Sequence, residues 1–101
     1  MARRYDLHSI LKEILGLESV YFQPPTNVVL EYPAIVYERA RMDVGFADNL
    51  PYRHKRRYKL TLIDRDPDSV LVGKVASLPL CSHDAFYTAE NLNHDVFTIY
   101  F

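Results

Sequence analysis

Apolar side chains recur at helical spacing in the first part of the chain. Between Arg4 and Leu15 the apolar positions lie three and four residues apart, which places them on one face of a helix. Gly16 follows at the position where a left-handed residue commonly ends a helix. The pattern predicts an amphipathic helix over 4–15 that buries one face against another element. That face consists of Leu7, Ile10, Leu11, Ile14 and Leu15.

The apolar runs that follow are shorter and rich in β-forming residues. Val20-Tyr21-Phe22 is stopped by Pro24-Pro25, and proline lacks the N–H that a ladder requires, so this strand should be short and lie at a sheet edge. Further along, Tyr58, Leu60 and Leu62 alternate with the residues between them, which is typical of a strand with one face buried. The predicted strands cover 20–22, 34–41, 53–64, 82–88 and 96–101, and the turn-rich residues 90–93 join the last two.

A second helix is predicted to start at Asp66-Pro67-Asp68-Ser69. Asp66 can accept hydrogen bonds from free backbone N–H groups, and Pro67 needs no donor at the first helical position. Gly73 lies within this helix and Pro79 ends it, so the helix should be short. The side chains expected to point inward are Val70, Leu71, Val75 and Leu78.

The predicted element order is α-β-β-β-α-β-β, and 101 residues suit one domain spanning 1–101. Short strands with few helices favour an α+β, two-layer domain: a mainly antiparallel sheet of four to five strands with both helices on one face. The other face of such a sheet must meet solvent or another subunit.

Charge is distributed unevenly along the chain, although the net charge is only −1. Residues 39–65 carry eight Lys or Arg against three Asp or Glu, a surplus of five positive charges. The segments 1–38 and 66–101 both have an acidic surplus. Such segregation favours specific association between copies or with partners rather than general affinity for nucleic acid.

The sequence contains no convincing arrangement of catalytic or metal-ligating residues. Asp64, Asp66 and Asp68 alternate as in a calcium loop, but the glycine and glutamate that such a loop requires are replaced by Ser69 and Val75. Cys81, the single cysteine, lacks the flanking glycines that expose a nucleophile, and a buried apolar role is the better interpretation. We therefore expect a protein that is not an enzyme and has no cofactor.

Two His–Asp pairs near the predicted last turn could also hold a metal ion if their strands form a hairpin. These are His83-Asp84 and His94-Asp95. Adjacent residues on a strand point to opposite faces, so at most one residue of each pair could share a site. Ordinary polar residues beside a turn are the favoured interpretation, and no metal site is expected.

The basic run Arg53-His54-Lys55-Arg56-Arg57 allows three interpretations: a phosphate-binding site, a solvated strand edge, or a contact with the acidic part of a neighbouring copy. The loop 43–52 precedes it and holds three large apolar residues, which either fold back onto the sheet or contact a partner. The candidate interface residues are Arg39, Arg41, Phe46, Leu50, Tyr52, Arg53, Lys55, Arg56 and Arg57.

Several motifs follow one another along nearly the whole chain. They are Tyr32-Pro33-Ala34-Ile35-Val36-Tyr37, Phe46-Ala47-Asp48-Asn49, Pro51-Tyr52, Ile63-Asp64-Arg65-Asp66-Pro67-Asp68-Ser69, Leu78-Pro79-Leu80-Cys81-Ser82 and Tyr87-Thr88-Ala89-Glu90-Asn91-Leu92-Asn93-His94. Together, in this order and spacing, they resemble the siphophage tail terminator or tail completion family, which is encoded in the head–tail gene region. No single motif is chemically diagnostic.

The resemblance implies an α+β subunit that assembles as a ring, typically hexameric, on the head-proximal end of the tail. Such a ring caps the tail tube, stops its growth and offers a docking surface to the head connector. The implied partners are further copies, the tail tube protein and a head-completion or connector protein, with DNA only passing through the lumen. The expected location is the virion, after assembly in the host cytoplasm, with no membrane contact. A head-side stopper or adaptor, a nucleic-acid-binding module and a small enzyme remain the alternatives.

Overall fold

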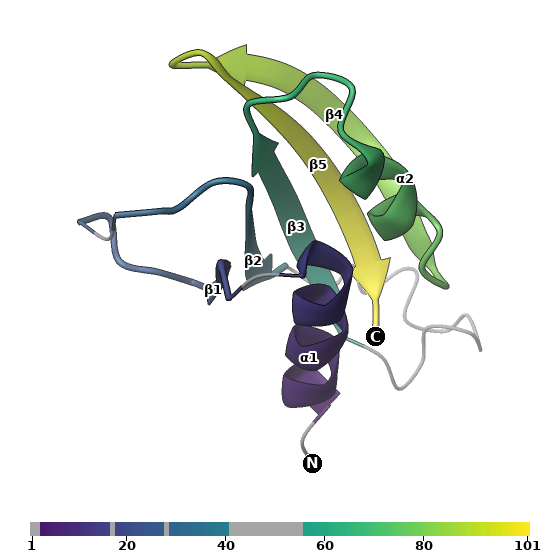
Figure 1. The fold of residues 1–101 in the computed structure, drawn as a ribbon. Helices are drawn as coiled ribbons and strands as arrows, with labels where there is room; N and C mark the ends of the chain where they lie inside the picture. The colour runs from purple at the N-terminus through teal and green to yellow at the C-terminus, as the bar shows by residue number, and fades with distance from the viewer. Residues whose placement is uncertain (1–2, 17, 28, 41–55) are drawn as a thin grey trace.

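The computed structural model describes residues 3–16, 18–27, 29–40 and 56–101. Its element order, α-β-β-β-α-β-β, is the predicted one. Figure 1 shows a twisted sheet with both helices against the same face, which confirms the α+β two-layer architecture. The elements are α1 (Arg3–Leu15), β1 (Val20–Phe22), β2 (Ala34–Arg39), β3 (Arg57–Asp64), α2 (Val70–Ala76), β4 (Cys81–Ala89) and β5 (Leu92–Tyr100).

The five strands in the described part of the chain lie in the order β1-β2-β3-β5-β4. Neighbouring strands are antiparallel except β1 and β2, which are parallel. The three-residue strand β1 lies at one edge of the sheet, as the two prolines after it predict. The last strand in sequence, β5, inserts between β3 and β4, so β4 forms the other edge.

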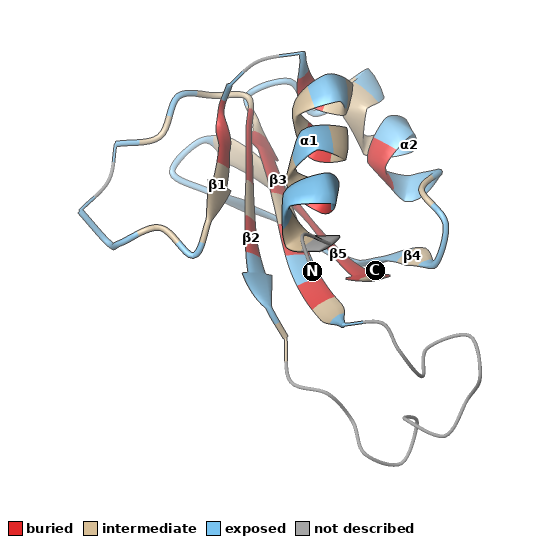
Figure 2. Ribbon diagram, turned by 90° about the horizontal axis from the view of Figure 1, so that it is seen from below, coloured by how far each residue is buried: buried red, intermediate tan, exposed pale blue. Residues whose placement is uncertain are grey.

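The core lies between the helices and the face of the sheet that they cover (Figure 2). The alternation predicted in β3 is confirmed, because Tyr58, Leu60 and Leu62 are all buried on this face. Leu7 and Leu11 of α1 pack against them and are completely buried. Helix α1 ends as predicted: Gly16 has φ +73°, and its N–H donates to the carbonyl of Lys12 at 2.8 Å. The remaining large buried side chains are Ile35, Tyr37, Val75, Phe97 and Ile99.

The chain itself covers part of the opposite face of the sheet. Ile63 points away from the helices, yet only 7% of its surface is exposed. Pro24, Pro25 and Leu30, from the segment between β1 and β2, lie over this face beside Ile63. They enclose a groove of about 360 Å³, whose floor includes Val36 and Thr61 and whose far wall is Tyr87 and His94. The expectation that this face must meet solvent or another subunit is therefore wrong for the part that the chain itself covers.

The start of α2 differs from the prediction. Its N-cap is Ser69, whose Oγ accepts a hydrogen bond from the Leu71 N–H at 3.2 Å, so the predicted cap at Asp66 is wrong. Asp66 instead accepts from the Asp68 N–H at 2.9 Å and forms a local turn. Val70 is 73% exposed and not inward-facing as predicted, whereas Val75 is buried. The helix is short, and its last residue is Ala76.

The last hairpin is longer than predicted. Strand β5 begins at Leu92, so only Glu90 and Asn91 form the connection between it and β4. Both residues have positive φ, 52° and 64°, which is the signature of a type I′ turn. Leu92 and Asn93 were predicted to lie in the turn, and His94 and Asp95 outside any strand. All four are paired with β4 instead.

Candidate interaction surfaces

The polar residues of the last hairpin divide between the two faces of the sheet. His83 and Asp95 lie on the helix face, where the imidazole Nε2 is 2.9 Å from a carboxylate oxygen. On the opposite face Thr98 donates its hydroxyl hydrogen to Asp84. His94 stacks its ring on Tyr87, with centroids 4.6 Å apart. The two histidines thus do not converge, and the described residues include no group of three side chains placed to hold a metal ion.

Cys81 is half-buried and packs against the core, in agreement with the predicted apolar role. Burial and the nearby Asp84 carboxylate raise the pKa of its thiol to about 11. A thiol with this pKa is almost entirely protonated near neutral pH, and the thiolate is the nucleophilic form. The surroundings of Cys81 therefore suppress its reactivity.

One end of the strands carries the cations Arg39, Arg56, Arg57 and Lys59, which we call the basic end; the exposed Glu38 lies opposite Lys59. Arg39 is the last residue of β2, and Arg57 begins β3 beside it. Arg56 and Arg39 are exposed, whereas Arg57 is half-buried. The structure thus brings together the three described members of the predicted interface set. The other six, Arg41, Phe46, Leu50, Tyr52, Arg53 and Lys55, lie outside the described residues.

The opposite end of the strands is acidic, and we call it the acidic end: Asp64, Asp66, Asp68 and Glu90. Asp64 ends β3 opposite Asn93, two residues from the turn that holds Glu90. The Asp64 and Asp66 carboxylates each accept a backbone N–H two residues ahead, at 3.1 Å and 2.9 Å, as they do in solvated turns. The eight residues of β3 hold the two ends roughly 20–25 Å apart.

The edge strand β4 is a surface that the sequence analysis did not identify. Eight of its nine residues are exposed; Cys81 is the exception. Phe86 and Tyr87 leave 52% and 48% of their surfaces in solvent, on opposite faces of the sheet. No described element pairs with the outer side of β4 (Figure 1). Two neighbouring aromatic residues in a predicted strand were the only sign of this surface in the sequence. Whether they are exposed depends on the order of the strands in the sheet.

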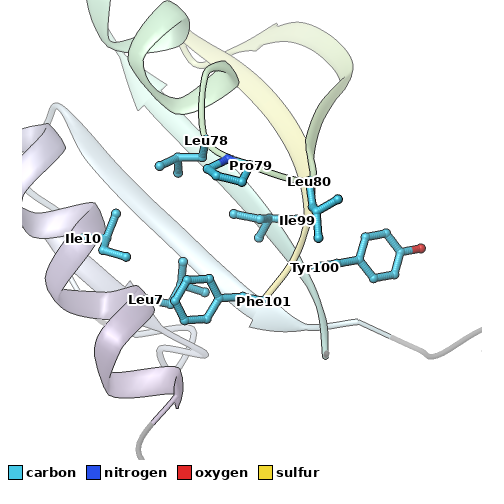
Figure 3. Close-up of a pocket in the computed structure, with 8 residues that line it drawn as sticks. All are labelled: Leu7, Ile10, Leu78, Pro79, Leu80, Ile99, Tyr100 and Phe101. Atoms are coloured by element: carbon cyan, nitrogen blue, oxygen red, sulfur yellow. The ribbon is translucent and has the colours of Figure 1, made fainter. Parts of the chain in front are cut away.

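An apolar cleft of about 210 Å³ opens between α1 and the turn that precedes β4 (Figure 3). Leu7 and Ile10 form one wall, and the Phe101 ring lies beside Leu7 at its base. The phenol of Tyr100 points away from these side chains. None of the described residues that line the cleft is an acid or a cation, so its chemistry suits an apolar side chain. The remaining lining residues are Leu78, Pro79, Leu80 and Ile99.

No family model matches the chain, and no curated protein or solved structure matches it either. Among the described residues, no helix is both long enough and apolar enough to cross a membrane.

Proposed function

We propose that the chain is a non-enzymatic structural protein of a tailed phage. It forms a ring on the head-proximal end of the tail tube. In the family that the sequence resembles, this ring is typically hexameric. The ring ends tube growth and joins the tail to the head connector, while DNA passes through its lumen. The motif order that resembles tail terminators suggests this role, and the placement of charge in the fold supports it.

The observation that carries the proposal is the separation of the basic end from the acidic end. A closed ring is built from head-to-tail contacts, in which one patch of each subunit meets a different patch on its neighbour. A subunit with exposed cations such as Arg39 and Arg56 at one end and carboxylates such as Asp66 and Asp68 at the other suits this arrangement. Opposite charges also steer subunits into the correct orientation and disfavour like-to-like contacts.

The test is negative-stain microscopy of the purified chain, alone and with tail tubes, combined with charge reversal. Arg39→Glu/Arg56→Glu should give folded subunits that no longer form rings, because both side chains are exposed and contribute little to stability. Lys74→Glu, matched to the single variant Arg56→Glu, is the control: it reverses one exposed cation on α2 and changes no residue of the basic end or the acidic end. Normal rings from the first variant, or a wild-type chain that never associates with tubes, would contradict the proposal.

The exposed cations of the basic end favour a second candidate, a nucleic-acid-binding module. This function predicts DNA binding that weakens steeply as salt increases and is lost in Arg39→Glu/Arg56→Glu. A fluorescence anisotropy titration at several salt concentrations separates it from the ring, since ring formation needs no DNA. A head-side stopper or adaptor is distinguished by its partner, because it would bind the connector and not the free tube.

A further inference from the structure

The segment between β1 and β2 projects from the rest of the molecule. Figures 1 and 2 both show it leaving the sheet on the side away from α2. We call its described residues, 23–27 and 29–31, the arm. Val29 of the arm is 85% exposed, more than any other large apolar residue that the structure describes. The arm thus carries an apolar side chain out into solvent.

The arm is held at both of its feet. At the first foot the Gln23 N–H donates to the carbonyl of Tyr37 at 2.9 Å. At the second foot the Glu31 N–H donates to the phenol oxygen of Tyr21 at 3.4 Å. Pro24-Pro25 fixes two backbone φ angles between the feet. A segment that is restrained before it binds loses less conformational freedom on binding.

The apolar cleft between α1 and the turn before β4 is suited to receive a side chain of this kind. Leu78 and Pro79 lie across the cleft from Ile10, and Phe101 lies at its base (Figure 3). Its volume of about 210 Å³ is below the roughly 300–1,000 Å³ of pockets that enclose small molecules. The cleft therefore has room for one or two apolar side chains rather than for a larger ligand.

The charges beside the cleft differ between its two sides. Arg56 and Phe101 exchange both backbone hydrogen bonds, at 3.1 Å and 2.9 Å, so their side chains share the helix face. An exposed cation of the basic end thus lies directly beside the base of the cleft. On α1 the exposed Asp6 and Glu13 lie one turn to either side of Ile10. A carboxylate that approaches the cleft is therefore attracted on the Phe101 side and repelled on the α1 side.

We infer that in the ring the arm of one copy docks on the cleft of its neighbour, with Val29 in the cleft and Glu31 directed toward Arg56. Glu31 is exposed and is the only charged residue of the sequence 23–31, so the arm matches the cationic side of the cleft. The arm leads into the start of β2, where Ala34 pairs with Ile63 near the acidic end, whereas the cleft lies beside the basic end. The contact is thus head-to-tail. It rests on the proposed ring and specifies the two patches that meet in it.

Sedimentation velocity and negative-stain microscopy of the full chain test the docking. We expect Val29→Ser to weaken association at least roughly tenfold, because it removes the apolar anchor without changing the charge. Leu80→Asn should act likewise: Leu80 lines the cleft, is 37% exposed and has φ 57°, which asparagine adopts more readily. Phe86→Ser is the control, because it replaces an exposed apolar residue away from the arm and the cleft. Undiminished association of Val29→Ser, or equal weakening by Phe86→Ser, would overturn the inference.

Disulfide cross-linking separates this contact from the ring itself. In a Cys81→Ser background, oxidised Val29→Cys/Leu80→Cys should give a ladder of covalent multimers, since each copy links to the next. Either cysteine alone should leave monomers, because position 29 meets position 80 and not itself. Cross-links from Val29→Cys alone would overturn the docking. Rings on tail tubes without a ladder would reject the docking and leave the ring standing, whereas a ladder without rings would support the docking and reject the closed ring.

Discussion

The imidazole Nδ1 of His8 lies 2.8 Å from the phenol oxygen of Tyr37, which joins α1 to β2 of the sheet. Tyr37 is completely buried, so its hydroxyl needs a partner within the protein. Burial lowers the pKa of His8, and the nearby Lys12 and Arg4 lower it further. Burial also raises the pKa of Tyr37. Both shifts favour the neutral pair, in which the Tyr37 hydroxyl donates to the imidazole.

We predict from this pair that the folded chain loses stability as the pH falls below about 6.5, the ordinary pKa of histidine. The folded-state pKa of His8 is lower than its unfolded value, so the unfolded chain binds more protons in this range and acid favours unfolding. His8→Gln should flatten the slope of unfolding free energy between about pH 5 and 7. His94→Gln, which leaves the pair intact, is the control and should retain the slope. Equal slopes for the wild type and His8→Gln would contradict the prediction.

The His8–Tyr37 pair also predicts how much the free energy of unfolding falls when the Tyr37 hydroxyl is removed. Tyr37→Phe keeps the ring that packs against Phe22, with centroids 4.9 Å apart, and removes the hydroxyl that bonds His8 and also interacts with Arg4. We expect a loss of about 1 kcal/mol in the free energy of unfolding, measured by urea denaturation. In a His8→Ala background the same substitution should cost less, because the two residues interact directly. A full loss in both backgrounds would show that another group binds the hydroxyl.

The type I′ turn between β4 and β5 offers a stabilising substitution. Glu90 has φ 52°, a conformation that strains a residue with a Cβ and that asparagine and glycine tolerate better. Glu90→Gly should therefore stabilise the hairpin by about 0.5–1 kcal/mol, measured as a rise in the urea midpoint. Asp68→Gly is a control, since it removes a carboxylate from the acidic end at a position without a positive φ. Destabilisation by Glu90→Gly would show that its side chain contributes more than its backbone strain costs.

Local patterns in the sequence predicted the elements whose signals come from neighbouring residues. The spacing of Leu7 and Leu11 gave α1, Gly16 gave its end, and the alternation of Tyr58, Leu60 and Leu62 gave the buried face of β3. The start of α2 was misplaced because Asp66 and Ser69 are both good caps. Only the structure shows that the Asp66 carboxylate accepts a hydrogen bond from the Asp68 N–H, so that Ser69 and not Asp66 is the N-cap of the helix.

The candidate surfaces were less predictable because they depend on which strands become neighbours. The basic run in 53–57 is visible in the sequence, but the approach of Arg57, one of its described members, to Arg39 follows from the pairing of β2 with β3. The exposure of Phe86 follows from the insertion of β5 between β3 and β4, which leaves β4 at the edge. Likewise, Ile63 is buried on the outer face only because the segment that includes Pro24 and Leu30 returns over it. Long-range pairing of this kind leaves no local pattern.

The thiol of Cys81 gives the last prediction. Its pKa of about 11 lies two units above the ordinary value of 9.0, which leaves about a hundredfold less thiolate at a given pH. Because the thiolate is the reacting form, iodoacetamide at about pH 8 should alkylate the native chain roughly a hundredfold more slowly than the urea-unfolded chain. Asp84→Asn should speed the native reaction, since that carboxylate is the second cause of the raised pKa after burial. Glu90→Gln is the matched control, which neutralises another carboxylate of the hairpin and should leave the rate unchanged. Native and unfolded chains that react equally fast would show that Cys81 is neither shielded nor held in its protonated form.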